Sequence, residues 1–295
     1  MSNICLIVGS DGTIGSALGN AMRGRGIEVW ATSRRDDVSS PRRAIHLDLT
    51  EPDRLRLPTA PGSAFLCAAR SGFLECEQSS DAAYRVNVAG SVAIARHLLP
   101  RGVFVVLLSS SAVYDGLTPL PEESLDPSPT TEYGRQKAEA ERQLLQLDAG
   151  RGNVAIVRLT KVFSSGTAVV RGFMQHLEKG EHVDAFSDLY ISPVSLGYVV
   201  ESLLAIERRR SGGIFHLSGS VELSYADFAR RLAGKMGVSP DLVGESTVEE
   251  SPIPVLYRPR HPALGMTLTS RSIGLHPEPI DTMLANLLAH ATAES

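Results

Sequence analysis

The chain has 295 residues, of which 43% are hydrophobic and 21% charged, and its formal net charge at pH 7 is -4. This composition is that of an ordinary globular protein, and it excludes a disordered, collagen-like or fibrous chain. The slight acidic excess leaves no concentrated basic surface for phosphates, so no nucleic-acid partner is expected. The length suits one large domain, or one domain with a smaller lobe.

The cysteine pattern indicates neither a disulfide framework nor a zinc site. Cys5, Cys67 and Cys76 are odd in number and lack metal-ligand spacing, and the eight histidines nominate no metal pair. No apolar run reaches the length of a membrane span, and the N-terminus lacks the basic flank and long apolar stretch of a signal peptide. We therefore expect a reducing, cytoplasmic location, with no metal and no membrane partner.

Short β-rich runs alternate with helix-period segments through the first 160 residues. This alternation predicts an α/β fold, a Rossmann doubly wound parallel sheet whose continuous apolar strands are covered on both faces. Ligands of such sheets bind beyond the carboxyl ends of the strands. The expected strands are 4–8, 27–31, 44–47, 63–67, 103–108 and 154–159, and the expected helices are 13–24, 80–99 and 131–148.

The pattern loosens after residue 160 and predicts a smaller C-terminal α+β lobe. We expect residues 1–160 to form the Rossmann domain. Residues 161–295 would form mainly a substrate-binding lobe, with some segments returning to the first domain. The cleft between the two parts is the expected active site. The expected elements are helices near 167–179, 195–209 and 224–236, with strands within 182–191 and at 213–217.

The first expected strand ends in a glycine-rich turn that suits a diphosphate. Its glycines are spaced by three residues and lead directly into the first helix. Glycine lets the main chain approach phosphate oxygens, and the helix N-terminus offers unpaired N–H groups. A tight turn that binds nothing is the alternative, but the position inside a βαβ unit favours a dinucleotide. The expected contacts are Gly9, Asp11, Gly12, Thr13, Ile14 and Gly15.

The end of the second strand distinguishes NADP from NAD. An acidic residue at this point binds the ribose hydroxyls of NAD, whereas a cation accepts the additional phosphate of NADP. The chain has Ser33, Arg34 and Arg35 here, and carboxylates follow only at Asp36 and Asp37. An arginine fork and a serine hydroxyl can bind a 2′-phosphate. We therefore favour NADP(H) over NAD(H), with arginines that only cap a surface loop as the alternative.

A serine, a tyrosine and a lysine provide the candidate chemistry. Three serines, 109–111, follow the fifth strand, and Tyr133 and Lys137 are spaced so that they share one helix face. Tyrosine normally titrates at about pH 10, and a lysine charge close by would favour its anion. Ser110 can hold a substrate carbonyl while Tyr133 passes it a proton and a nicotinamide delivers hydride.

The Tyr-x-x-x-Lys spacing alone is a weak signal, since such pairs also occur on exposed helices. Its combination with the glycine turn and the serine-rich strand end brings all three features to one sheet edge. A serine hydrolase is disfavoured, because Ser110 lies in no G-x-S-x-G elbow and no histidine is placed as its partner. We therefore assign Ser110, Tyr133 and Lys137 as catalytic, with Tyr133 and Lys137 also contacting the cofactor.

Six further segments carry a family resemblance over nearly the whole chain. They are AARSGFLECE (68–77), AAYRVNVAG (82–90), SSSAVYDG (109–116), YGRQKAEAE (133–141), IFHLSG (214–219) and YRPRH (257–261). With the glycine turn, they resemble the extended short-chain dehydrogenase/reductases and, within them, the dTDP-4-dehydrorhamnose reductase branch. The catalytic residues of that family match Ser110, Tyr133 and Lys137, while Ser111 stands where these reductases usually carry aspartate.

The resemblance also implies cofactor contacts that the spacing alone does not indicate. Asp48 would contact the adenine, and Asn87 matches the family's structural or proton-relay asparagine. The alternatives are an Asp48 that only forms a turn and an Asn87 that only caps backbone groups inside a helix. The additional cofactor contacts implied in this way are Asp48, Leu49, Cys67, Ala68, Ala69 and Asn87.

The departures from the family concern the sugar side of the cleft. Phe73 and Leu74 replace a Val-Asp pair, Lys161 replaces a tryptophan, and 189–194 differs from the usual pattern while keeping its proline. Lys161 would bind a charged sugar group or a diphosphate, with a surface lysine as the alternative. Arg258 would clamp a diphosphate, with a structural ion pair as the alternative. The expected substrate contacts are Arg70, Ser110, Ser111, Lys161 and Arg258.

The expected function is the NADP(H)-dependent reduction of a keto group on a nucleotide-activated sugar. An NAD-dependent sugar-nucleotide epimerase and a non-catalytic nucleotide-binding regulatory subunit are the alternatives. A 4,6-dehydratase is less favoured, because its family carries Asp-Glu where this chain has Ser111 and Ala112. The identity of the sugar and of the nucleotide stays open, and the resemblance allows a homodimer.

Overall fold

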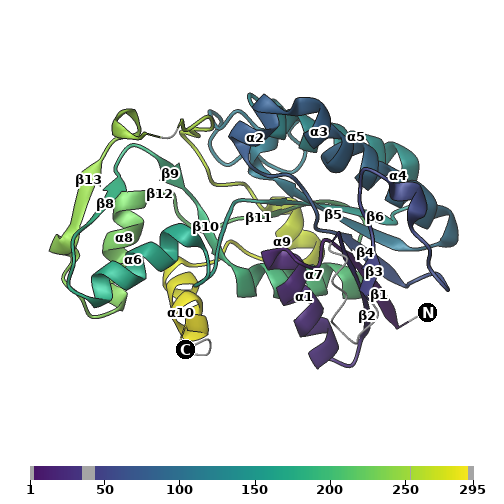
Figure 1. The fold of residues 1–295 in the computed structure, drawn as a ribbon, viewed down its shortest axis with the longest axis horizontal. Coiled ribbons are helices and arrows are strands. Elements are labelled where there is room, and N and C mark those ends of the chain that lie inside the picture. The colour runs from purple at the N-terminus through teal and green to yellow at the C-terminus, as the bar shows by residue number, and fades with distance from the viewer. Residues whose placement is uncertain (1–2, 35–43, 253, 292–295) are drawn as a thin grey trace.

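The computed structural model describes residues 3–34, 44–252 and 254–291, which form a sheet domain and a smaller lobe (Figure 1). Seven parallel strands make up the central sheet, in the order β11-β6-β5-β4-β1-β2-β3. The strand order reverses between β1 and β4, so the predicted doubly wound Rossmann sheet is confirmed. The strands are β1 (Ile4–Val8), β2 (Glu28–Ser33), β3 (Ala44–His46), β4 (Ser63–Leu66), β5 (Phe104–Ser110), β6 (Val154–Leu159) and β11 (Gly213–Leu217).

Helices cover both faces of the sheet, and Figure 1 shows α4 and α5 above it with α1 and α7 below. One face buries residues such as Ile7 and Val106 against α1, α7 and α9. The other face buries residues such as Leu6 and Val105 against α4 and α5. Because successive strand residues face opposite sides, strands covered on both faces must be apolar throughout. The helices are α1 (Thr13–Gly24), α4 (Ser91–Leu98), α5 (Glu132–Asp148), α7 (Leu196–Arg209) and α9 (Thr267–Ile273).

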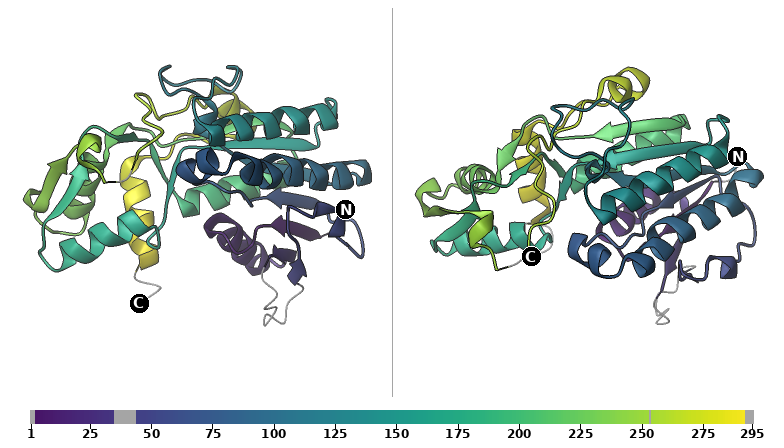
Figure 2. Two further views of the ribbon diagram at one scale, coloured as in Figure 1. Left: turned by 45° about the horizontal axis from the view of Figure 1, so that its top comes forward. Right: turned by 90° about the horizontal axis from the view of Figure 1, so that it is seen from above.

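The smaller lobe has its own core and lies to the left of the sheet domain in Figures 1 and 2. Phe163, Phe228 and Leu284 belong to this core, which joins three helices to short strands. Although α7, β11 and α9 follow segments of the lobe in the sequence, they pack with the central sheet. The elements outside the sheet domain are β7 (Lys161–Phe163), α6 (Ala168–Glu178), β8 (Val183–Phe186), β9 (Tyr190–Ile191), β10 (Pro193–Ser195), β12 (Leu223–Ser224), α8 (Tyr225–Lys235), β13 (Val243–Ser246) and α10 (Ile280–Ala291).

The segment 80–99, expected to be one helix, is divided into three parts. The three parts are α3 (Ser80–Tyr84), a π-helical stretch, Arg85–Gly90, and α4. A further short helix, α2 (Phe73–Gln78), precedes them. A hydrophobic period near 3.6 does not distinguish one wide π-helical turn from the α-helical turns around it. The π-helical stretch therefore could not be predicted from the sequence. Helices α9 and α10 are additional to the expected elements.

The helices have the amphipathic character of a globular protein. α5 is the longest helix among the described residues, with 17 residues, and its sequence EYGRQKAEAERQLLQLD is rich in charge. Within residues 3–34, 44–252 and 254–291, no helix has both the length and the apolar character that crossing a bilayer requires.

Candidate active site

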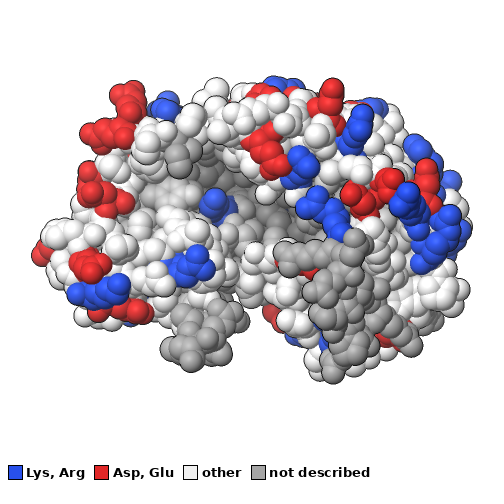
Figure 3. All heavy atoms as spheres, in the orientation of Figure 1, with Lys and Arg blue, Asp and Glu red and all other residues white. Residues whose placement is uncertain are grey.

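A cavity of about 640 Å³ lies beyond the carboxyl ends of β5 and β6. One wall comes from the sheet domain and includes residues 109–111 and Tyr133. The opposite wall comes from the C-terminal half of the chain and includes 189–192, Tyr225 and 254–257. Figure 3 shows the surface hollowed between the two parts of the molecule. Doubly wound sheets bind their ligands at this position.

Ser110 and Tyr133 meet at the sheet-domain wall. Ser110 is the last residue of β5, and Tyr133 is the second residue of α5. The Ser110 hydroxyl lies close enough to the Tyr133 phenol to lower its pKa, and Tyr133 is 9% exposed, so only its edge reaches the cavity. Ser110 Oγ also accepts a hydrogen bond from Ala112 N at 3.1 Å, which fixes the serine at the turn after β5. Two residues 23 positions apart in the sequence thus form one polar site.

Burial governs the acid strength of Tyr133 and Lys137. Burial raises the pKa of Tyr133 to about 12; Cys76 adds to this effect and the Ser110 hydroxyl opposes it. Burial lowers the pKa of Lys137 to about 8, while Glu141 raises it. The sequence led us to expect that Lys137 favours the anion of Tyr133. Among the described residues, Cys76 and Ser110 shift the pKa of Tyr133, and Lys137 does not. Tyr133 keeps its proton at neutral pH, which is the form that a proton donor needs.

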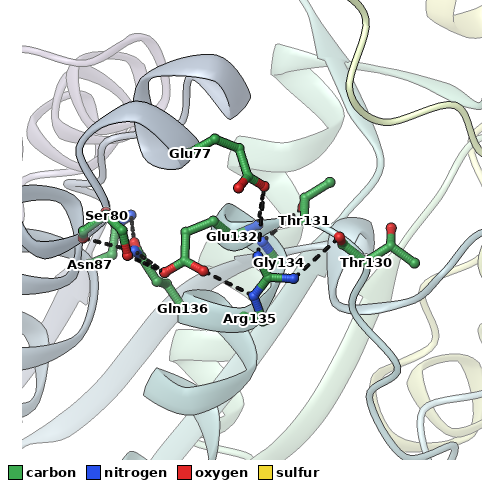
Figure 4. Close-up of polar contacts among 9 residues, drawn as sticks. All are labelled: Glu77, Ser80, Asn87, Thr130, Thr131, Glu132, Gly134, Arg135 and Gln136. Carbon is green, nitrogen blue, oxygen red and sulfur yellow. Dashed lines mark hydrogen bonds and ion pairs between the residues drawn. The ribbon is translucent and has the colours of Figure 1, made fainter.

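Hydrogen bonds from α2 and α3 fix the first turn of α5, which carries Tyr133 (Figure 4). Glu132 Oε1 accepts from Ser80 Oγ at 2.6 Å, and Glu132 N donates to Glu77 Oε1 at 2.8 Å. Gln136 Nε2 donates to Ser80 O at 3.1 Å and to Glu132 Oε1 at 2.9 Å. The start of α5 is therefore held against the neighbouring helices by charged and amide groups.

Asn87 connects α5 to the loop after β4. Its Oδ1 accepts from Arg70 N at 2.8 Å, and its Nδ2 donates to Arg70 O at 2.9 Å and to Gln136 Oε1 at 2.9 Å. Figure 4 shows Asn87 facing Gln136. The side chain of Asn87 is fully buried. This arrangement favours the structural interpretation of Asn87 over a direct cofactor contact.

In the glycine turn after β1, the packing of the protein requires glycine at two positions and not at a third. Gly9 has a φ of +88°, and a Cβ there would lie 2.7 Å from Ala68, while a Cβ at Gly15 would lie 2.3 Å from Gly9 O. Both positions therefore require glycine for the fold itself. Gly12 has an ordinary φ of -78°, and a Cβ there would lie 3.5 Å from Gly9 O, an ordinary van der Waals contact. Packing therefore does not require glycine at position 12, whereas a ligand phosphate approaching the main chain there would.

The other predicted residues of the turn lie around a second cavity of about 400 Å³. Asp11, Gly12 and Thr13 line this cavity, with Thr13 as the first residue of α1. Asp11 Oδ2 accepts a hydrogen bond from Ser33 Oγ at 2.5 Å, which ties the turn to the end of β2. The side chain of Ile14 packs on the core of the sheet, so its main chain is the part available to a ligand.

The residues expected at the adenosine end lie beside β2 and β3. Arg34 is exposed, and Arg35 lies outside the described residues. Asp48 Oδ1 accepts from Thr50 N and Thr50 Oγ1, both at 2.8 Å. These bonds lower the pKa of the Asp48 carboxyl, with a smaller contribution from Arg34. Asp48 therefore forms a turn close to Arg34, and the adjacent Leu49 is buried.

The segment after β4 is held against the glycine turn. The amides of Cys67 and Ala68 donate to Val8 O at 2.9 Å and 3.0 Å. Burial raises the pKa of the Cys67 thiol, so Cys67 is a packing residue here and not a thiolate. Ala69 is exposed beyond it. These positions place main-chain groups beside the turn.

The predicted substrate residues separate into two groups. Ser110, Ser111 and Lys161 line the 640 Å³ cavity, whereas Arg70 and Arg258 are absent from its described lining. Arg70 pairs with Glu75 at 3.0 Å, and the exposed Arg258 donates from Nε to Val255 O at 3.2 Å. Lys161 retains solvent access in β7, although the surrounding protein lowers its pKa. Among the described lining residues, Lys161 supplies the cationic side chain.

Aromatic residues that sequence reasoning did not assign complete the site. Phe73 contacts Tyr133 edge-on, with ring centroids 5.5 Å apart, and stacks on Tyr257 at 5.4 Å. Tyr257 Oη donates to the carbonyls of Ser111 and Tyr114, each at 3.3 Å. The sequence identified Phe73 as a departure from the family, but no local signal links it to a residue 184 positions away. Tyr190 and Tyr225 line the opposite wall and were also missed.

Comparison with known proteins matches residues 3–293 to a family described as RmlD substrate binding domain. A dTDP-4-keto-6-deoxy-D-glucose reductase of Streptomyces niveus is 29% identical over 290 residues, covering 94% of this chain and 93% of the relative. The structure of a dTDP-4-dehydrorhamnose reductase of Bacillus anthracis in complex with NADP has a TM-score of 0.83 at 18% identity, covering 98% of this chain and 99% of that one. MoeE5 in complex with UDP-glucose and NAD has a TM-score of 0.79 at 22% identity, covering 99% of both chains.

Proposed function

We propose that this chain, which belongs to the RmlD substrate binding domain family, reduces a keto group on a nucleotide-activated sugar and uses NADP(H) in preference to NAD(H). The family resemblance predicted from the sequence is confirmed, and the relatives include proteins named dTDP-4-keto-6-deoxy-D-glucose reductase and dTDP-4-dehydrorhamnose reductase. The observation that carries the proposal is that Ser110 and Tyr133 line the same cavity wall as neighbours, with Lys137 buried one turn further along α5.

The residues at the strand ends fit a nicotinamide dinucleotide. Gly12 leaves space for a diphosphate where the packing of the protein has no need of glycine. The first turn of α1, at Thr13, offers unpaired N–H groups to the same diphosphate. Ser33 and Arg34 lie at the end of β2, where the 2′-phosphate of NADP would bind. Lys137 and Tyr133 would hold the nicotinamide half near the reacting carbonyl.

The reduction needs a hydride and a proton, and a bound NADPH supplies the hydride. The Ser110 hydroxyl donates a hydrogen bond to the carbonyl oxygen and holds it beside Tyr133. As the carbonyl carbon gains the hydride, the Tyr133 phenol gives its proton to the oxygen, and the product is an alcohol. Solvent then returns a proton to the Tyr133 phenolate, which restores the acid for the next turnover.

The direct test is NADPH consumption by the purified protein with a panel of nucleotide-linked 4-keto sugars. We expect at least one dTDP-linked 4-keto-6-deoxy sugar to be reduced, with one alcohol formed per NADPH oxidised. Product configuration, determined by NMR, then identifies the sugar. If NADPH binds but none of the 4-keto sugars is turned over, the reductase proposal is wrong and a regulatory nucleotide-binding role replaces it.

The preference for NADP(H) is tested at Arg34. We expect Arg34→Ala to reduce the ratio of NADPH to NADH affinity by about tenfold, since a charge-assisted contact to the phosphate is lost. Arg151→Ala, at another exposed arginine, is the control and should leave the ratio unchanged. An unaltered ratio in the Arg34 variant would remove this residue from the cofactor site.

A further inference from the structure

A chain of buried polar side chains continues from the active site into the sheet domain. Glu141 of α5 is 2% exposed and accepts hydrogen bonds from Ser109 Oγ and from Arg158 Nη2, the latter at 2.7 Å. Arg158 of β6 is 1% exposed and also donates to Tyr114 Oη. His216 of β11 lies 3.3 Å from Tyr114 Oη and is fully buried. Three strands and α5 therefore share one hydrogen-bonded network.

Burying the charges of Glu141 and Arg158 lowers the free energy of unfolding by their desolvation, so folding alone gains little from this network. Removing two charges from water is unfavourable, and a buried ion pair is often no more stable than an apolar pair of similar volume. The exposed pair of Arg142 and Glu139, on the same helix at 2.6 Å, carries no such cost. The position of the Glu141 carboxylate therefore needs an explanation beyond folding.

The geometry connects Glu141 to both catalytic elements. Tyr133, Lys137 and Glu141 are spaced by four residues along α5 and share its buried face. Ser109 directly precedes Ser110, so the bond from Ser109 to Glu141 ties the end of β5 to α5.

The groups that face these charges come from several elements. Glu141 from α5 and Cys67 from the end of β4 face Lys137. Ser109 of β5 and Arg158 of β6 face Glu141, and β5 and β6 place these two residues side by side in the sheet. Tyr114, His216 and Glu123 lie beyond Arg158.

We propose that Glu141 is a positioning residue that keeps the buried Lys137 ammonium charged and holds α5 against the end of β5, so that Ser110, Tyr133 and Lys137 stay in register. The use of Lys137 in turnover rests on the proposed function, but the electrostatic role of Glu141 does not. Burial lowers the pKa of Lys137 to about 8 and Glu141 raises it, which agrees with this role. Without the carboxylate, burial would neutralise the lysine at a lower pH.

The test follows the titration of Lys137 directly by NMR. The chain contains four lysines, Lys137, Lys161, Lys179 and Lys235, so lysine labelled at Cε gives four side-chain signals, and Lys137→Met assigns the relevant one. In Glu141→Gln, which keeps a hydrogen-bonding group for Ser109, we expect the midpoint of Lys137 to fall by about one pH unit. Glu139→Gln removes the exposed carboxylate of the same helix and should leave the midpoint unchanged.

The double variant Glu141→Gln/Arg158→Met keeps the test decisive if the single variant does not fold, because it removes both buried charges together. Its midpoint should also fall, by less than in Glu141→Gln, since the unpaired arginine charge is gone. A wild-type midpoint in either folded variant would overturn the proposal. The titration needs neither cofactor nor substrate, so a lowered midpoint in a protein without reductase activity would refute the proposed function alone.

Discussion

The two walls of the main cavity are built in different ways. On the sheet-domain side, Ser110 is held by a hydrogen bond from Ala112 N, and α5, which carries Tyr133, is anchored through Glu132 and Gln136 to neighbouring helices. On the opposite side, Tyr190, Leu189 and Leu256 present mainly apolar surface, and Tyr190 and Leu256 are exposed. The first wall holds polar atoms in fixed positions, whereas the second offers shape and contact area.

This difference suggests a division of labour between chemistry and recognition. Groups that move a proton must be held within a fraction of an ångström, and the bonded wall provides that constraint. Groups that recognise a sugar or base act through contact area and one or two polar anchors, which the looser wall provides. Variants of the first wall should therefore lower kcat, and variants of the second should mainly raise KM.

The largest effect is expected at Tyr133. Tyr133→Phe removes the proton donor while keeping the ring packed against Phe73, so kcat should fall at least about a hundredfold. NADPH binding, measured by fluorescence titration, should stay close to that of the wild type. Tyr84→Phe, at an exposed tyrosine of α3, is the control and should turn over normally. Wild-type turnover by the Tyr133 variant would exclude the phenol as the acid.

A smaller effect of a different kind is expected at Lys161. Lys161→Met keeps most of the side-chain volume but removes the cation that lines the cavity, so KM for the nucleotide sugar should rise by about tenfold with little change in kcat. Lys179→Met, at an exposed lysine after α6, should change neither parameter. A fall in kcat comparable to that of Tyr133→Phe would instead place Lys161 in the chemical step and break the division between the walls.

The smallest effect on turnover is expected at Gln136. Gln136→Leu leaves the buried Asn87 amide and the Ser80 carbonyl without their partner, so the free energy of unfolding should fall by about 2 kcal/mol. The rate should fall only a few-fold, because Gln136 bonds to neither Tyr133 nor Ser110. Gln143→Leu, at a half-buried glutamine of α5 that bonds only to Glu139 of the same helix among its described partners, is the matched control in denaturant titration and kinetics. Equal stability of the two variants would show that Gln136 does not anchor the helix.

Local sequence signals were sufficient to predict the sheet and the shared helix face of Tyr133 and Lys137. Continuous apolar runs gave the strands, since a strand between two helical layers must be apolar on both sides. The spacing of Tyr133 and Lys137 placed both on one face of α5, and Lys137 is indeed buried there. The glycine turn could be recognised because it follows the first strand directly.

Only the tertiary structure decided the remaining features, because they depend on contacts between segments far apart in the chain. The stack of Phe73 on Tyr257 and the pairing of Glu141 with Arg158 join positions that no local pattern relates. Packing also leaves Arg258 exposed and outside the described cavity lining, and burial raises the pKa of Tyr133, where spacing alone had suggested the opposite shift. The amino-acid sequence thus determined which residues share an element, while desolvation and long-range packing determined which residues share a site and in which protonation state.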